Sequence, residues 1–252
     1  MHAYLQLMRQ LTCRFEMSPE KMIELVLTGE EYEFSQELCE AFWNGFPVEN
    51  MRPLLASPSL RVQALGSYLV YELGGKARPL LDDIVSNLEH SDAQIRADAI
   101  NCLADCVTKF DTDLAGRLVL MLADEDPFVQ RIAMKFVQYC DRSVLNAGVL
   151  NAAKTASDTV FKEFPRCIGE RPIGAWSALP VCVNSLARLT HHESPIARRF
   201  GVALAARPRL IVDETFLDIA AVVADDGCDV FIEAARQFGP FRGRELMRIP
   251  VV

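Results

Sequence analysis

The sequence lacks the short motifs that carry most known catalytic and metal chemistry. It has no GxSxG nucleophile elbow, no glycine-rich phosphate loop, no GxGxxG fingerprint after a strand and no HExxH zinc helix. Its eight cysteines include no CxxC pair, and its four histidines do not cluster with them. We therefore expect no catalytic site, no metal site and no cofactor in a chain that is not an enzyme.

Long apolar runs are also missing. None approaches the length needed to span a bilayer, and the N-terminal stretch MHAYLQLMRQLTCRF is interrupted by two glutamines and two arginines, which argues against a signal peptide. We expect no contact with a membrane and a cytoplasmic location. There the cysteines would be reduced and would pack as small hydrophobic residues. Cys102 and Cys106 share one helix face, but no histidine lies nearby to complete a metal site.

The charge is acidic and unevenly distributed. The 252 residues carry a formal net charge of −8. Residues 1–159 hold 14 Lys and Arg against 23 Asp and Glu, whereas residues 160–252 hold 12 against 11. An acidic majority opposes binding to nucleic acid and favours a basic partner.

A short segment recurs along the chain. The copies are ASPSLRVQAL (56–65), HSDAQIRADAI (90–100), DEDPFVQRIA (124–133), HESPIARRFGV (192–202) and DDGCDVFIEAA (225–235). Their capping residues, Ser57, Asp92, Asp126, Ser194 and Gly227, are 35, 34, 68 and 33 residues apart. Because 68 is two periods of 34, a degenerate copy should lie near residue 160.

Each copy predicts a tight turn between two helices. Apolar residues three and four apart precede each turn, and an apolar residue pairs with a small one after it, as in Ile95 with Ala99 and Val129 with Ala133. The Ser or Asp of each turn can cap a helix, and a proline can follow it at the first helical position. A two-helix unit cannot bury its apolar face alone, so the units must stack into an all-α solenoid.

These segments resemble HEAT repeats of the short bacterial type, also called phycobilisome-lyase-like, whose pattern is roughly D-P-D-P-x-V-R-x-x-A. The match is good over 77–139, moderate over 179–238 and almost absent over 1–56. The resemblance implies a right-handed superhelix of helical hairpins. It also implies that Arg61, Arg96 and Arg198 pair with turn acids as a ladder, although Gln130 stands at that position in DEDPFVQRIA.

We predict one solenoid domain over 1–252. Divergent helices or a cap would occupy 1–56, five to six repeats would occupy 57–238 with a degenerate stretch near 158–180, and 239–252 would form a C-terminal cap or tail. The stretch 163–180 is rich in proline and glycine and includes Trp176. It is either a degenerate repeat or an irregular binding surface anchored by Trp176.

Candidate partner-binding residues lie on two kinds of surface. Asp98, Asn101 and Asp105 form a polar line on a second helix, which we expect on the solvent-facing concave surface. Asp124 and Glu125 precede a helix cap and are available to solvent or to a basic partner, and the absence of later calcium ligands argues against a metal loop.

An aromatic line forms the second kind of surface. Tyr139 continues the line of Ile132 and Phe136, and Phe200 and Arg207 occupy the matching line of the next clear copy. These positions either pack in the core, which the solenoid geometry favours, or line an aromatic groove.

The sequence favours a protein-binding module whose concave face receives another protein. One version is an immunity or inhibitor protein that masks a basic toxin. An alternative is a HEAT-like DNA-binding protein or alkylpurine DNA glycosylase, which the net charge and the two tryptophans, Trp43 and Trp176, argue against. A bilin lyase-like chaperone is a further alternative that rests on the repeat's resemblance alone.

Overall fold

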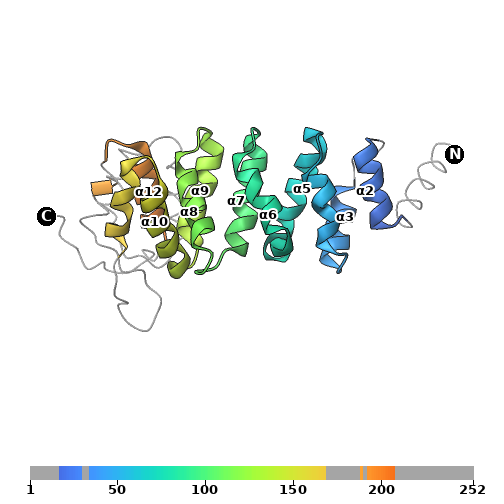
Figure 1. Ribbon diagram of the computed structural model, residues 1–252, viewed down its shortest axis with the longest axis horizontal. Coiled ribbons are helices and arrows are strands. Elements are labelled where there is room, and N and C mark those ends of the chain that lie inside the picture. Colours follow the sequence, from blue (N-terminus) through green and yellow to red (C-terminus); the bar gives the residue numbers. More distant parts are fainter. Residues whose placement is uncertain (1–16, 30–33, 169–187, 190–191, 208–252) are drawn as a thin grey trace, which may run out of the picture. The chain divides into compact units, whose positions relative to one another are not determined.

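A computed structural model describes residues 17–29, 34–168, 188–189 and 192–207. All the regular elements of these residues are α-helices or 3-10 helices, so the chain is an all-α protein of stacked helices, as predicted (Figure 1). None of these helices is long and apolar enough to cross a membrane. The chain divides into two compact units, unit 1 (1–106) and unit 2 (107–252). The right-handed superhelix and the single domain stay predictions.

Unit 1 is built from paired helices. Its elements are α2 (Pro19–Thr28), α3 (Ser35–Trp43), η1 (Val48–Met51), α4 (Arg52–Leu55), α5 (Leu60–Leu73), η2 (Gly74–Leu80), α6 (Leu81–Ser86), η3 (Asn87–Glu89) and α7 (Ala93–Cys106). In one layer α5 packs against both α3 and α7, and in the other α4 contacts α2 and α6. Leu54 of α4, Leu69 of α5 and Ile100 of α7 are fully buried in the core of this unit.

Helix capping at two of the predicted turns is confirmed. Asp92 Oδ1 accepts hydrogen bonds from the backbone N–H groups of Gln94 and Ile95, at 2.8 and 3.2 Å. Asp126 Oδ1 accepts the same pair of bonds at the start of α9, and Pro127 is the first residue of that helix. The small residues expected after these caps, Ala99 and Ala133, are fully buried. Local turn chemistry therefore fixes where these helices begin.

Two other turns differ from the prediction. The residue that precedes α5 is Ser59, not Ser57, and the helix begins at Leu60 rather than at Pro58. Ser57 Oγ instead accepts a hydrogen bond from the N–H of Ser59 at 3.2 Å. At the last described copy Ser194 stands at the capping position, but its side chain makes no capping hydrogen bond.

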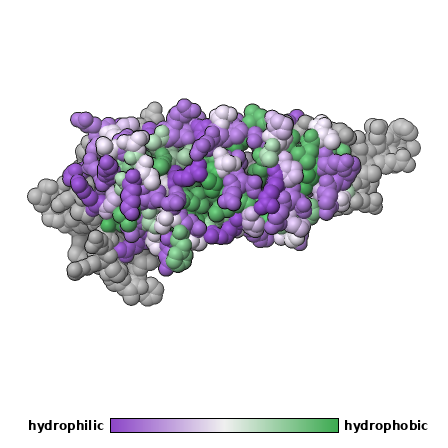
Figure 2. Space-filling view, in the orientation of Figure 1, coloured by the Kyte–Doolittle hydropathy of each residue, from purple (hydrophilic) through white to green (hydrophobic). Residues whose placement is uncertain are grey.

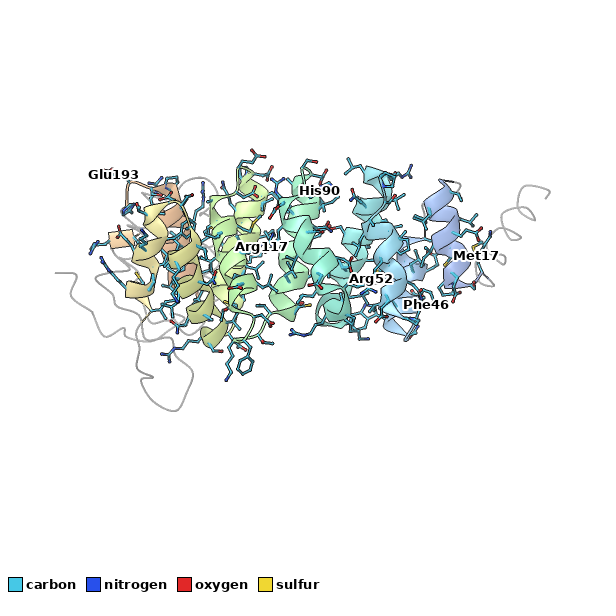
Figure 3. All side chains as sticks on the ribbon, in the orientation of Figure 1. Met17, Phe46, Arg52, His90, Arg117 and Glu193 are labelled. Atoms are coloured by element: carbon cyan, nitrogen blue, oxygen red, sulfur yellow. The ribbon has the colours of Figure 1, made fainter. Side chains whose placement is uncertain are left out.

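The Ser57 contact recurs as a structural signature of the repeat. In each turn a side chain two residues before the cap position accepts the backbone N–H of that position. His90 Nδ1 accepts from Asp92 at 2.9 Å, Asp124 Oδ1 from Asp126 at 2.8 Å, and His192 Nδ1 from Ser194 at 3.0 Å. Figure 3 labels His90 and Glu193, which lie on two of these turns. Serine, histidine and aspartate thus perform one structural task at equivalent positions.

The arginines that follow the caps brace the same turns through backbone carbonyls. Arg96 Nη1 donates to the carbonyl oxygens of His90 and Ser91 at 2.8 and 3.0 Å. Arg198 Nη1 makes the equivalent pair of bonds, to His192 at 2.8 Å and Glu193 at 2.7 Å. Carbonyls of the same turn therefore hold these guanidinium groups, and the ladder of arginine–carboxylate pairs stays a prediction.

Gln130 takes the arginine's place in the remaining turn. Its Nε2 donates to the carbonyl oxygen of Asp124, six residues earlier, which is the same separation as that between Arg96 and His90. Gln130 thus makes the same kind of turn contact as the arginines, and whether this turn lacks the ladder pairing stays a prediction. A glutamine amide is long enough to reach the carbonyl that the arginines reach elsewhere.

Unit 2 stacks its helices in a different order. Its described elements are α8 (Thr112–Leu120), η4 (Met121–Ala123), α9 (Pro127–Tyr139), α10 (Arg142–Thr155), η5 (Thr159–Cys167) and α12 (Pro195–Ala205). Near residue 160, η5 is a 3-10 helix that contains Pro165, and the degenerate repeat expected near 158–180 stays a prediction. α12 packs directly against α9, and η5 contacts α10 and α12.

Long-range hydrogen bonds hold α12 against the preceding helices. Gln138 Nε2 donates to the carbonyl oxygen of Ala206 at 2.8 Å, across 68 residues, and Arg199 Nη1 donates to that of Leu122 at 3.2 Å. The ring of Phe200 lies on that of Phe164, with centroids 4.0 Å apart and ring planes 3° from parallel. Two periods of sequence thus separate helices that are neighbours in the structure.

Candidate functional site

A pocket of about 520 Å³ lies in unit 1, between α3 and α5. Its lining residues are Ser35, Gln36, Cys39, Glu40, Trp43, Asn44 and Tyr68. All except Tyr68 come from α3 and its C-terminal cap, where they form two rows with a spacing of four residues. That spacing places each row on one side of the helix, while Leu38 and Phe42 point into the core. Figure 3 labels Phe46, which lies just beyond the end of α3.

Aromatic side chains are unusually exposed around this pocket. Trp43 is 49% exposed and Tyr68 is 40% exposed, and Tyr71, one helical turn from Tyr68, is 42% exposed. Figure 2 shows that apolar residues come to the surface among hydrophilic ones on the visible face of unit 1. Exposed aromatic rings that lie together are typical of protein-binding surfaces.

The indole of Trp43 already holds a cation of its own chain. Lys76 Nζ lies 3.8 Å from the ring centroid, which is a cation–π contact, and it donates a hydrogen bond to the carbonyl oxygen of Trp43 at 3.2 Å. Lys76 belongs to η2 and is not part of the pocket lining. The bond to the carbonyl anchors the ammonium beside the indole, where the cation–π contact stabilises it.

Negative charge dominates the pocket. Burial raises the pKa of the Cys39 thiol, and the nearby carboxylates of Glu72 and Glu40 raise it further. Burial also raises the pKa of the Tyr68 hydroxyl, again with Glu72, which hydrogen-bonds to it, as a second cause. Glu40 Oε1 accepts a hydrogen bond from Gln36 Nε2 at 3.1 Å. Burial is the first cause of both shifts, and Glu72 contributes to each.

The acidic character extends over the whole of unit 1. Residues 1–106 contain 8 Lys and Arg against 16 Asp and Glu, whereas residues 107–252 contain 18 of each. Unit 1 thus carries the entire formal net charge of −8. A surface of one sign attracts partners of the opposite sign and speeds their association.

Burial shapes the chemistry of the cysteines in unit 1. A nucleophilic cysteine needs a lowered pKa, and that of Cys39 is raised. Among the described residues no group of three or more His, Cys, Asp or Glu could hold a metal ion. Cys102 and Cys106 are buried, and both thiols contact the carbonyl oxygen of Gly74 at 3.6 Å. The hydrogen bond with Cys106, together with burial, raises the pKa of the Cys102 thiol.

The polar line predicted on α7 is only partly exposed. Asp98 is 5% exposed, so the expectation that it faces solvent is wrong. It lies between α5 and α7, where it accepts a hydrogen bond from Gln94 at 2.8 Å and interacts with Ser67, and burial raises its pKa. Asn101 is half-buried and Asp105 is exposed. Asp105 lies beside Gly74, so that a side chain at Gly74 would come within 2.6 Å of its carboxylate.

The remaining predicted residues lie in unit 2. Asp124 is half-buried in the turn contact described above, and Glu125 beside it is exposed. Tyr139 is 63% exposed at the end of α9, whereas Phe200 is fully buried on Phe164, as the core interpretation predicted, and does not line a groove.

Arg207 is the last described residue of the chain and follows the end of α12. Its side chain contacts the last turn of α9. Its guanidinium donates to the carbonyl oxygens of Val137 and of Cys140, the latter at 2.6 Å. Burial raises the pKa of the Cys140 thiol to about 11, although Arg207 acts in the opposite direction. Trp176 lies outside the described residues. Whether any of the predicted residues binds a partner stays a prediction.

The pocket itself was missed by sequence reasoning, which considered Trp43 only as a residue for a DNA glycosylase. The sequence does contain one indication of this pocket. Cys39 and Trp43 are four residues apart, with Glu40 between them, in an acidic stretch of the chain. Tyr68 and Tyr71 are three residues apart on α5. The indication was hidden because α3 lies in the part of the chain that does not match the repeat.

Comparisons with known proteins assign no activity. No family model matches the sequence, and no curated protein matches it. Among solved structures, an engineered protein crystallised by the Northeast Structural Genomics Consortium aligns with 87% of this chain and 95% of its own, at 14% identity and a TM-score of 0.46.

Proposed function

We propose that this chain is a HEAT-like repeat protein that binds another protein, with unit 1 as the docking surface and a basic face on the partner. The observation that carries the proposal is the pocket between α3 and α5, with exposed aromatic residues in the unit that holds the whole net charge. Aromatic anchors supply most of the binding energy in protein interfaces, and opposite charge steers the encounter.

The turn contacts support the repeat assignment. The capping aspartates, the side-chain acceptor two residues before each cap, and the bracing arginine or glutamine recur in equivalent places in both units. Stacked repeats of this kind offer extended surfaces for partner proteins. The acidic charge of unit 1 opposes a role in binding nucleic acid. A narrower form of the proposal is an inhibitor that masks a basic toxin.

Site-specific crosslinking in cells of the source organism tests the proposal. A photoreactive phenylalanine analogue replaces Tyr71 in unit 1, and the control replaces Tyr139, a tyrosine in unit 2 that is more exposed, at 63% against 42%. We expect a covalent adduct with a basic protein from position 71 and none from position 139. Adducts of equal yield at both positions, or none at position 71, would overturn the proposal. An inhibitor would also abolish the activity of the captured protein at equal stoichiometry.

A further inference from the structure

The pocket between α3 and α5 has features that select one kind of chemical group. The pocket lining contains one charged residue, Glu40, and no lysine or arginine. Trp43 and Tyr68 supply aromatic surface. Within the part of the chain that the structure describes, Glu40 Oε1 is bonded to Gln36, and Oε2 has no hydrogen-bond partner. A carboxylate oxygen beside aromatic rings suits a flat cationic group, which stacks on a ring and donates to an oxygen at the same time.

On the premise of the proposed function, we infer that this pocket receives an arginine side chain of the basic partner, with its guanidinium donating to Glu40 and stacking on the aromatic wall of Trp43 and Tyr68. The volume of about 520 Å³ accommodates an arginine with its neighbouring residues. Arginine is preferred to lysine because a planar guanidinium can stack and donate to a carboxylate together.

The internal contact of Trp43 supports this assignment. Lys76 Nζ lies 3.8 Å from the ring centroid, so the indole is attractive to a cation in the folded protein. Lys76 is anchored by its bond to the Trp43 carbonyl and does not belong to the pocket lining.

The raised pKa values of two lining residues agree with an arginine side chain in this pocket. The pKa values of Cys39 and Tyr68 are both raised, and Glu72 contributes to each. A cation that enters the pocket lowers this electrostatic cost for the thiolate. We therefore expect the pKa of the Cys39 thiol to fall when the pocket is occupied by a cationic side chain.

A peptide titration tests the inference directly. The protein carries Trp176→Phe so that Trp43 is the one fluorescent tryptophan. The probes are the blocked tripeptide acetyl-Gly-Arg-Gly-amide and its citrulline analogue, which has the same shape without the charge. We expect the arginine peptide to change Trp43 fluorescence in a saturable manner, with an affinity about tenfold above that of the citrulline peptide. Equal responses to both peptides, or no saturable response, would overturn the inference.

Matched variants locate the binding. Glu40→Gln removes the charge in the lining, and Glu37→Gln removes an equal charge from the same helix outside the lining. Tyr68→Leu and Phe110→Leu form the corresponding aromatic pair, because Phe110 is an exposed aromatic residue of unit 2, outside the lining. We expect Glu40→Gln and Tyr68→Leu each to weaken the arginine peptide about fivefold to tenfold, and both controls to leave its affinity within about twofold. Equal losses within each pair would contradict the pocket, because general acidity or general aromatic exposure would then account for binding.

The captured partner separates this inference from the proposed function. If the protein crosslinked at position 71 binds the Glu40→Gln and Tyr68→Leu variants as tightly as the original chain, the arginine pocket is wrong and the docking function stands. If the peptide binds as expected and no protein is crosslinked, the pocket stands and the docking function is wrong.

Discussion

The two units stack similar helices with different neighbours. In unit 1 the buried hydroxyl of Ser67 on α5 bonds to the carbonyl oxygen of Ile95 on α7, 28 residues later, at 3.4 Å. In unit 2 the corresponding bond, from Gln138 on α9 to Ala206, crosses 68 residues. Successive hairpins supply successive neighbours in unit 1, whereas the neighbour of α9 comes from two periods later. The shared turn chemistry therefore defines a hairpin without defining which hairpin packs against it.

Charge divides the molecule along the same boundary. Unit 1 carries the net charge and the pocket with exposed aromatics, and unit 2 is neutral overall, with its stacked rings Phe164 and Phe200 buried. Both units bury some aromatic rings and expose others, so the net charge and the pocket are what distinguish the surface of unit 1. Regular stacking leaves the exposed side of a helix available for recognition.

The largest expected effect comes from deleting a core ring in one unit. Phe200→Ala removes a fully buried ring from unit 2, and we expect a loss of roughly 3–5 kcal/mol in the free energy of unfolding. Leu69→Ala is the counterpart in unit 1, with roughly 2–5 kcal/mol. Amide hydrogen exchange should show faster opening only in the unit that carries the substitution. Uniform acceleration along the described chain would show that the units unfold together and would break the comparison.

The next largest effect separates the two inter-helix bonds. Gln138→Ala leaves the Ala206 carbonyl without its buried donor, and we expect it to cost about 1–3 kcal/mol. Ser67→Ala in unit 1 should cost less, since the Ser67 bond is longer, at 3.4 Å, than the 2.8 Å Gln138 bond. Urea denaturation of the two variants provides the comparison. A larger loss for Ser67→Ala would show that the long-range contact of unit 2 contributes little.

A third test asks whether the turns of the two units are interchangeable. Arg96→Ala removes the donor to the His90 and Ser91 carbonyls, and we expect a loss of about 1–2 kcal/mol. Arg96→Gln should recover part of that loss, because Gln130 performs the equivalent task in unit 2. Thermal unfolding measures both variants. If Arg96→Gln is as damaging as Arg96→Ala, the two turns are not equivalent and the charge of the guanidinium is required.

The smallest effect is a pH dependence that belongs to unit 1. The pKa of Asp98 is raised by burial above its ordinary value of 3.8, so the folded state binds a proton more readily than the unfolded state. The protonation of Asp98 therefore favours folding at acidic pH. This contribution is lost as the pH rises from 3.8, the ordinary pKa, through the raised pKa of the folded state. Asp98→Asn should remove this decline and should be neutral or slightly stabilising at pH 7. Denaturation curves for both proteins between pH 4 and pH 7 test this expectation, and parallel curves would contradict it.

Sequence reasoning predicts what local chemistry determines. The period and the caps at Asp92 and Asp126 follow from residues within a few positions of one another, and the structure confirms them. The register of the first copy was wrong by two residues, since ASPSLRVQAL offers both Ser57 and Ser59 at plausible capping positions. The bond from Gln130 to the Asp124 carbonyl is a contact with a backbone atom, which the side-chain pattern of the repeat does not reveal.

Burial and stacking order depend on distant residues, and the sequence does not reveal them. Asp98 is buried because Ser67 and α5 cover it, and no local pattern signals that contact. A spacing of 68 residues is compatible with a further helix packed between α9 and α12, and equally with direct contact between them. The pocket beside Trp43 was equally hidden, since its rows come from a helix outside the recognised repeat.

The direct packing of α12 on α9 has a consequence for the order in which the molecule folds. Closing a chain loop of 68 residues costs about 0.8 kcal/mol more entropy than closing one of 28 residues. Contacts with low sequence separation form sooner, so we expect the pairing of α5 with α7 to precede that of α9 with α12. During that interval Phe200 has no stacking partner and its ring is open to other chains. We therefore expect unit 2 to be more open to aggregation than unit 1 while the chain folds.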